Sequence, residues 1–397
     1  KKDMERSRWY FMYRIDLLNK ISKKGLNLFT EKYEHGTDIS NPDGILVRSK
    51  EMKDMTLPSS LKAIARAGAG VNNIPIDKCS EKGIVVFNTP GANANGVKEL
   101  VILGMLMACR NVVGGIAWAK GLVGEGDKVP DLIEKGKSKF AGTEIMGKKL
   151  GVVGLGAIGT MVANTAEGLG MEVWGYDPFL SIEAAWRLSR NTKKAASLDK
   201  LLAECDFITL HVPQNKDTKG FMNTEKFAVM KKGAVLLNFA RGGLVDTAAL
   251  KKAIADGIVG CYVTDFPDEE VIKTDKVIPI PHLGASTEES EENCAVMAAL
   301  QLMDYLENGN IKNSVNFPEC VLDRTGKKRI TLSNQNTPGM IEKITKLLAE
   351  NNLNIADMIN KSRGNLAYNI IDVEGSAGDD LVEKIQAIEG VIRARVI

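Results

Sequence analysis

The chain has 397 residues, of which 44% are hydrophobic and 26% are charged, a composition typical of a globular protein with two or three domains. Its net charge of +2 is too small to indicate binding to nucleic acid or to an anionic membrane surface. The six cysteines form no Cys-x-x-Cys pair and show no metal-ligand spacing, which favours buried thiols in the reducing cytoplasm and no metal site.

No apolar run reaches the length of a membrane span, and we expect no signal peptide. The first residues are charged and unpatterned, so we expect Met12 to be the native start and residues 1–11 to be a remnant.

From Tyr13 to about Val97, short apolar runs alternate with helical stretches. The runs DGILVRS, LKAIARAGAG and GIVVFNTPG indicate buried strands that end in turns. This repetition of strand and helix predicts a parallel sheet. Residues 98–122 then predict one long helix that is apolar on more than one stripe, so we expect both faces to be buried, one of them by a partner subunit.

The strongest motif is GLGAIG, residues 154–159, which follows a short apolar strand and opens a helical pattern. Gly154 permits the tight turn, Gly156 lets a pyrophosphate approach the backbone, and Gly159 lets the helix pack closely on the strand. The N–H groups at the start of the helix favour anions. Asp177 ends the next strand, 18 residues after Gly159, where a carboxylate suits the ribose hydroxyls of NAD. The motif therefore predicts an NAD site.

Further strands are predicted to end at HVP, NFAR, TDFP and PHLG. Ligands of open α/β sheets collect at the carboxyl ends of the strands, so all these ends are expected to face the cofactor. The predicted cofactor-binding residues are Gly154, Gly156, Ala157, Ile158, Gly159, Asp177, His211, Val212, Pro213, Asn238, Ala240, Asp265 and Gly284.

After the last of these strand ends, the pattern of predicted elements changes. Residues 288–308 predict an amphipathic helix with an acidic first turn, and 309–328 a polar connector. The remaining residues follow the order strand, helix, strand, strand, helix, strand, which is the ferredoxin-like βαββαβ order.

Residues 40–310 resemble the D-2-hydroxyacid dehydrogenase family through RAGAGVNNI, GIVVFNTPG, GVVGLGAIG, NFARGGLVD and PHLGASTEES. The C-terminal part resembles a regulatory ACT domain through NTPGMIEKI and NNLNIA.

The resemblance implies an α/β protein in which a Rossmann NAD domain is inserted into a flavodoxin-like substrate domain. The expected boundaries are 12–95 with 286–310 for the substrate domain, 96–285 for the Rossmann domain, 311–328 for a linker and 329–397 for the ACT domain.

The resemblance also implies an activity, in the branch of the family that acts on 3-phospho-D-glycerate. That branch oxidises this substrate with NAD to 3-phosphohydroxypyruvate, the first step of phosphorylated serine synthesis. A dehydrogenase for another 2-hydroxy acid, such as a glyoxylate or hydroxypyruvate reductase, and a non-catalytic NAD sensor or corepressor are the alternatives.

Hydride transfer at a carbon bearing a hydroxyl group requires a residue that moves the hydroxyl proton near neutral pH, and histidine is the natural choice. Of the three histidines, His35 lies in a polar stretch expected to be a solvated loop, and His211 is expected to line the cofactor. His282 sits at a strand end in a motif matching the family's acid/base segment, so we predict it to be the proton carrier.

Arg241 lies in NFARGGLVD, which matches the family motif whose arginine holds the substrate carboxylate in a planar fork. A carboxylate beside the histidine would orient the ring. When TDFPDEEV is aligned on Phe266, that carboxylate is Glu269, with Glu270 adjacent as an open alternative. The family's cofactor-side aspartate falls on Thr264, while Asp265 sits one residue later.

The resemblance assigns the substrate's other contacts to Arg48, Ser49 and Asn93. In the C-terminal part, Asn334, Asn336 and Asn354 match positions that bind serine in some relatives, so allosteric control by L-serine is a hypothesis. The partners expected are therefore small molecules and further copies of the chain, as a homodimer or homotetramer.

Overall fold

The structure, a computed structural model, describes residues 13–375 and 378–397, so the expected start at Met12 lies outside the described residues. The chain forms two compact units. One comprises residues 93–290, and the other joins the residues up to Ala92 with those from Glu291 onward. Each unit is described by itself. The domain boundaries expected from the sequence stay a prediction.

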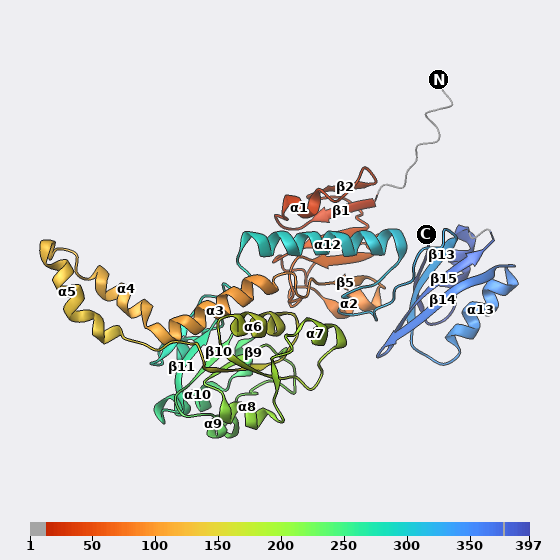
Figure 1. Ribbon diagram of the computed structural model, residues 1–397. Coiled ribbons are helices and arrows are strands. Elements are labelled where there is room, and N and C mark those ends of the chain that lie inside the picture. The colour runs from red at the N-terminus through yellow and green to blue at the C-terminus, as the bar shows by residue number, and fades with distance from the viewer. Residues whose placement is uncertain (1–12, 376–377) are drawn as a thin grey trace. The chain divides into compact units, whose positions relative to one another are not determined.

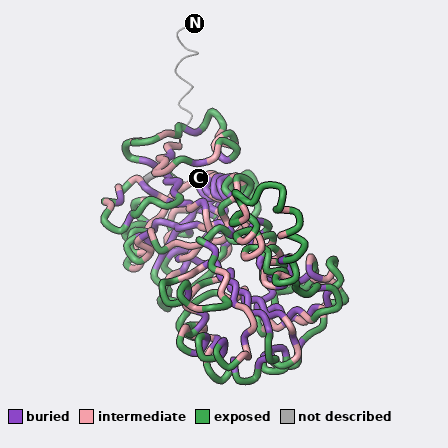
Figure 2. The backbone as a smooth tube through the Cα atoms, turned by 90° about the vertical axis from the view of Figure 1, so that its left-hand side faces the viewer, coloured by how far each residue is buried: buried purple, intermediate pink, exposed green. Residues whose placement is uncertain are grey.

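The unit of residues 93–290 is built on a seven-stranded parallel sheet with the order β12-β11-β10-β9-β6-β7-β8. Its central strands are buried along their whole length, as is typical of a parallel sheet with helices on both faces. Figure 2 colours the buried residues purple along the chain. The strands are β6 (Lys149–Val153), β7 (Glu172–Tyr176), β8 (Lys193–Lys194), β9 (Phe207–Leu210), β10 (Ala234–Asn238), β11 (Val259–Thr264) and β12 (Val277–Pro279). The α/β, Rossmann-type prediction is confirmed.

The helices of this unit connect those strands. They are α3 (Ala94–Arg110), α4 (Val112–Lys120), α5 (Val129–Gly136), α6 (Ala157–Gly168), α7 (Ile182–Arg187), α8 (Leu198–Glu204), α9 (Thr224–Val229), α10 (Thr247–Ala255) and α11 (Glu269–Ile272).

The prediction of one helix over 98–122 is wrong. Asn111 adopts a left-handed conformation (φ 30°, ψ 39°), which ends α3 and lets α4 start at an angle of 68° to it. Asparagine tolerates this conformation better than most side chains. In the part of the chain that the structure describes, no single helix is long and apolar enough to span a membrane, and α3 with α4 meets that test only as a bent pair.

The other unit contains a five-stranded parallel sheet with the order β2-β1-β3-β4-β5. Helix α12 (Glu288–Asn308) packs on this sheet through Ala298 and Leu302, and Gly25 lets α1 lie directly against the backbone of Ala295. The single helix expected over 288–308 is therefore confirmed (Figure 1). The strands are β1 (Tyr13–Leu17), β2 (Tyr33–Gly36), β3 (Gly44–Val47), β4 (Ala63–Arg66) and β5 (Val85–Phe87), with helices α1 (Lys23–Leu26) and α2 (Ile76–Glu81).

A four-stranded antiparallel sheet with the order β14-β15-β13-β16 ends the chain. The element order βαββαβ agrees with the sequence expectation, while the assignment as an ACT domain stays a prediction. Its elements are β13 (Lys328–Gln335), α13 (Met340–Glu350), β14 (Asn354–Arg363), β15 (Leu366–Glu374), α14 (Asp379–Gln386) and β16 (Val391–Val396).

One face of this sheet packs on α13 and α14, and the other faces the end of α12. Arg395 stacks on the ring of Tyr305 at 4.2 Å and donates to the carbonyl of Leu306 at 3.2 Å. Arg329 and Asp372, both fully buried, form a bidentate pair at 2.7 and 2.9 Å. Removing one partner of such a pair costs about 3–5 kcal/mol, because the other charge is left buried without a counterpart.

Candidate active site

The glycine motif forms the turn between β6 and α6. Gly154 has φ +91°, and a Cβ atom there would lie 2.8 Å from the carbonyl of His211. A Cβ on Gly159 would collide with the carbonyl oxygen of Gly154. A Cβ on Gly156 would meet no atom within 4 Å, so the space in front of the α6 N-terminus is open to a ligand. This geometry fits a dinucleotide pyrophosphate, which the first N–H groups of α6 at Ala157 and Ile158 would face.

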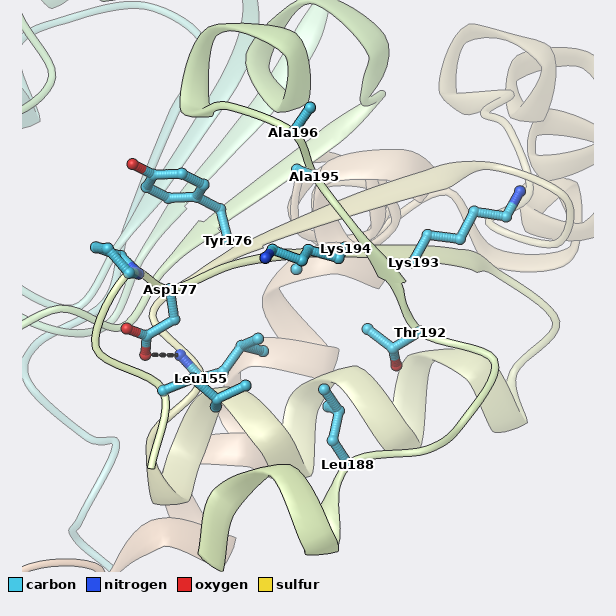
Figure 3. A pocket seen from close by; sticks show the side chains of 12 residues that line it. Leu155, Tyr176, Asp177, Leu188, Thr192, Lys193, Lys194, Ala195 and Ala196 are labelled. Carbon is cyan, nitrogen blue, oxygen red and sulfur yellow. Dashed lines mark hydrogen bonds between the residues drawn. The ribbon is translucent and has the colours of Figure 1, made fainter. Parts of the chain in front are cut away.

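A pocket of about 390 Å³ lies beside this turn, at the end of β7 (Figure 3). Asp177 lines it, and its two carboxylate oxygens accept hydrogen bonds from the N–H groups of Leu155 and Phe179, each at 2.8 Å. Lys194 extends along the pocket with its ammonium group toward the side where Asp177 lies (Figure 3). Leu155 and Leu188 supply apolar walls, so the pocket suits an adenosine whose ribose hydroxyls face the carboxylate.

His211 stands just after β9. Its Nε2 lies 2.9 Å from the hydroxyl of Thr209, while its Nδ1 is buried and has no hydrogen-bond partner within the described residues. Burial lowers the pKa of His211 to about 3. The ring is therefore neutral near pH 7.

Asn238 ends β10 and is fully buried. Its side chain donates to the carbonyl of Arg241 at 2.9 Å and accepts from the N–H of Ala240 at 3.2 Å, so it shapes the turn that carries Arg241. Val212 packs against a hydrophobic core cluster of this unit, and the carbonyl of Pro213 accepts a hydrogen bond from the hydroxyl of Thr218.

Three side chains meet at the ends of β10, β11 and β12. The ring of Phe266 lies 4.6 Å from the imidazole of His282, measured between ring centroids. The guanidinium carbon of Arg241 lies 5.9 Å from the centre of the same phenyl ring. The structure therefore brings the predicted carboxylate-binding arginine and the predicted proton carrier to one aromatic side chain. His282 and Arg241 are both exposed, as residues that meet a substrate must be.

Asp265 follows β11 directly and is 1% exposed. It accepts hydrogen bonds from the N–H groups of Leu283 (2.7 Å) and Gly284 (2.8 Å). Burial raises the pKa of Asp265, and these two N–H groups oppose that shift. Thr264 is fully buried, and its hydroxyl accepts from the N–H of Phe266 at 3.1 Å.

Glu269 and Glu270 lie in the first turn of α11. The Glu269 carboxylate pairs with Lys273 at 2.5 Å and is 80% exposed, while Glu270 pairs with Lys251 at 2.8 Å. Within the residues that the structure describes, neither carboxylate contacts His282. The choice of Glu269 as the partner of His282 stays a prediction.

The predicted substrate residues fall in different units. Arg48 belongs to the unit with the five-stranded sheet, where its guanidinium pairs with Glu291 at 2.5 Å. The side-chain oxygen of Asn19 accepts from the N–H groups of Arg48 (2.9 Å) and Ser49 (3.1 Å), which fixes this loop. Asn93 begins α3 in the other unit, and its side chain makes no capping hydrogen bond to that helix.

Sequence reasoning overlooked Phe266, which lies beside both Arg241 and His282, and it overlooked Asn19 and Glu291, which in the other unit hold the loop of Arg48. Asn19 lies two residues past β1, and a polar residue after a strand end was the one available signal. Phe266 was used for alignment alone, because sequence spacing carries no information about which rings stack.

The three asparagines of the C-terminal sheet do not converge. Asn334 is buried, donates to the carbonyl of Gln335 and accepts from Asn369 at 2.8 Å. Asn336 donates to the carbonyl of Gly364 at 3.1 Å. Asn354 lies at the far end of β14 and donates to Glu374 at 2.8 Å.

Comparison with known proteins identifies the class. A family model described as the NAD-binding domain of D-isomer specific 2-hydroxyacid dehydrogenases matches residues 103–284. The D-3-phosphoglycerate dehydrogenase of Haemophilus influenzae is 38% identical over 340 residues, covering 83% of this chain and 79% of that protein. The enzyme of the same name from Escherichia coli is 36% identical over 353 residues, covering 85% and 82%. The chain therefore belongs to the D-2-hydroxyacid dehydrogenase family and is an NAD-dependent oxidoreductase.

Solved structures agree with this fold. The NAD⁺-bound 3-phosphoglycerate dehydrogenase of Entamoeba histolytica matches with a TM-score of 0.58 and 28% identity, covering 77% of this chain and 99% of that one. The D-mandelate dehydrogenase of Rhodotorula graminis matches with a TM-score of 0.64 at 23% identity, covering 76% and 97%, which supports the fold alone.

The neutral state of His211 has a measurable consequence for stability. An exposed imidazole has a pKa near 6.5, so between pH 6.5 and about 3 the unfolded chain binds a proton that the folded chain does not. This contribution to stability is fully present above pH 6.5. It is lost as the pH falls, at up to about 1.4 kcal/mol per pH unit.

We therefore expect the melting temperature of the wild type to fall more steeply from pH 6.5 to pH 4.5 than that of His211→Gln. His35→Gln removes an exposed histidine and should keep the wild-type slope. Equal slopes for wild type and His211→Gln would contradict the buried, neutral state of His211.

Proposed function

We propose that this chain oxidises 3-phospho-D-glycerate to 3-phosphohydroxypyruvate with NAD, the entry step of phosphorylated L-serine synthesis. The observation that carries this proposal is the meeting of Arg241 and His282 on the ring of Phe266, in a chain similar over most of its length to proteins named D-3-phosphoglycerate dehydrogenase.

The glycine turn and Asp177 would hold NAD, which would supply the acceptor for the hydride from C2 of the substrate. His282 accepts the proton of the C2 hydroxyl as the carbonyl forms, and returns it in the reverse direction. A proton carrier must reach solvent between turnovers, and the exposure of His282 permits this. Glu269 is proposed to orient the imidazole of His282 in the reacting complex. Its contact with His282 would form only there, since catalytic hydrogen bonds often tighten when the substrate binds.

Arg241 is proposed to bind the C1 carboxylate of the substrate. Its guanidinium donates to the carbonyl of Ala240 at 2.7 Å, which leaves further N–H donors for a carboxylate. Arg48, Ser49 and Asn93 are proposed to bind the remaining polar groups of the substrate, and the cationic Arg48 suits a phosphate. Unphosphorylated substrates would leave that charge without a counterpart.

The substrate assignment is tested by following NADH absorbance in the reducing direction with a panel of 2-keto acids. We expect 3-phosphohydroxypyruvate to give the highest kcat/KM, at least ten-fold above hydroxypyruvate and glyoxylate. Turnover of the unphosphorylated acids alone would contradict the substrate assignment. Turnover of none would favour the non-catalytic NAD sensor.

The chain is also proposed to act as a homodimer or homotetramer. Helix α4 has no buried residue, and Val112, Val113 and Ile116 are each about half exposed. With the exposed Leu103 and Leu106 of α3, they form an apolar surface that a second copy would cover.

We further propose a cytoplasmic location, since all six cysteines are free thiols. Burial raises the pKa of Cys79, Cys205 and Cys320 to about 12, which keeps them protonated.

We also propose that L-serine regulates the chain at an ACT domain. The strand register limits which asparagines can bind one serine molecule. Asn334 pairs with Ala367 at one end of β15, whereas Asn354 pairs with Glu374 at the other end. Seven residues of strand separate these ends, which is about 23 Å. One serine therefore reaches both asparagines only if they come from two copies of the chain.

Titration of serine tests this regulation. We expect serine to lower kcat at saturating substrate and to raise the melting temperature. In Asn336→Ala, the serine concentration that gives half of each effect should be at least ten-fold higher. Glycine serves as a ligand control, since it lacks the hydroxyl group. No response of rate or melting temperature to serine would reject the regulatory site while leaving the catalytic proposal intact.

A further inference from the structure

Asp265 is the first residue after β11, and its side chain is almost completely buried. Its carboxylate therefore has its contacts within the protein, and these contacts define what it does.

Those contacts are all with the turn that carries His282. Asp265 accepts from the N–H of Leu283 at 2.7 Å and from the N–H of Gly284 at 2.8 Å, one bond to each carboxylate oxygen. The backbone N–H of His282 also faces the carboxylate. Hydrogen bonds from N–H groups to a buried carboxylate are among the strong ones in proteins.

The backbone of this turn has an uncommon conformation. His282 has φ +54°, in the left-handed region, which only a few per cent of residues other than glycine adopt and in which histidine is found more often than most side chains. Contacts from the surroundings hold a residue in such a sparsely populated conformation. The two N–H groups that follow His282 are held by Asp265, and the N–H of His282 itself donates to the carbonyl of Ile280 at 3.0 Å.

The burial of Asp265 argues against contact with the cofactor. The side chain is 1% exposed, whereas that of Asp177, which lines the open pocket, is only partly buried. A residue that binds the nicotinamide carboxamide would have to present an oxygen to it. Asp265 is instead directed into the protein, toward Gly284.

Asp265 is also joined to the neighbouring aromatic side chain. Phe266 follows it in the chain, and the hydroxyl of Thr264 fixes the N–H of Phe266 at 3.1 Å. The Phe266 ring then contacts His282 at 4.6 Å and lies beside Arg241 at 5.9 Å. One buried carboxylate thus holds the backbone of His282, while the next residue packs against its ring.

We propose that Asp265 is a positioning residue that holds His282 in its left-handed turn and so aims the imidazole at the substrate, and that it is not a ligand of the cofactor. This inference rests on the proposed role of His282 as proton carrier. Asp265 acts through the backbone of Leu283 and Gly284 and touches no reacting atom.

The test separates positioning from cofactor binding. Asp265→Asn keeps the size of the side chain but points an amide N–H₂ group at one of the two backbone N–H groups, so one hydrogen bond is lost. We expect kcat to fall at least ten-fold, while the KM for NADH and the NADH dissociation constant from fluorescence stay within two-fold of the wild type. Asp206→Asn is the matched control.

Asp206 accepts from the backbone N–H of Lys149 at 2.9 Å, at the opposite end of the strands. Its variant should lower the melting temperature and leave kcat unchanged. If Asp265→Asn does not fold, Gly284→Ala tests the same contact, because the added Cβ would lie 3.0 Å from Oδ2 of Asp265 and displace the carboxylate. The same fall in kcat is expected for this variant.

A spectroscopic measurement tests the inference without any turnover. The chain has three histidines, so ¹³C-labelled histidine gives three resolvable ring signals. We expect the His282 signal to shift or broaden in Asp265→Asn and to stay in place in Asp206→Asn. A wild-type chain without activity on any keto acid would defeat the proposed function, and this spectrum would still test the role of Asp265.

Two results would overturn the inference. A rise in the NADH dissociation constant with kcat unchanged would make Asp265 a cofactor ligand. Unchanged kcat together with an unmoved His282 signal would show that the turn holds its conformation without this carboxylate.

Discussion

The two hydrogen bonds between the buried carboxylate of Asp265 and the N–H groups of Leu283 and Gly284 tie the ends of β11 and β12 together. The segment after β12 has no regular structure of its own, and His282 within it adopts a left-handed conformation. Without an anchor, such a segment would sample many conformations. We therefore infer that the position of His282, the proposed proton carrier, depends on a side chain from the neighbouring strand end.

Hydrogen bonds between a polar side chain and the backbone fix other turns along the same edge of the seven-stranded sheet. Asn238 shapes the turn that carries Arg241, and the backbone N–H groups of Leu155 and Phe179 hold Asp177. Parallel strands bring all these ends to one edge, and short side chains beyond each strand fix the turns. The exposed His282, which we propose to be catalytic, is in the same way held through the backbone of its turn.

Much of this arrangement could be predicted from the sequence. The glycine motif, the strand ends and the βαββαβ order follow from local patterns that the structure bears out. The break of the 98–122 helix at Asn111 was not predictable, because a single residue in a left-handed conformation leaves the apolar pattern unchanged. The contacts of Asp265 and Phe266 with the His282 turn were also missed, since they join residues 16 or more positions apart in the chain. The sequence pattern assigned Asn334 and Asn354 to one serine site, whereas the strand register places them at opposite ends of β15.

We propose that His282 carries the proton while other residues hold the cofactor. The most direct measurement is the rate of NADH oxidation by His282→Ala with 3-phosphohydroxypyruvate, together with NADH binding followed by fluorescence. General acid–base catalysis contributes about 10²–10⁴-fold to the rate, so we predict a loss of that size in kcat with the NADH dissociation constant within two-fold of the wild type. Near-normal turnover by His282→Ala would contradict the account.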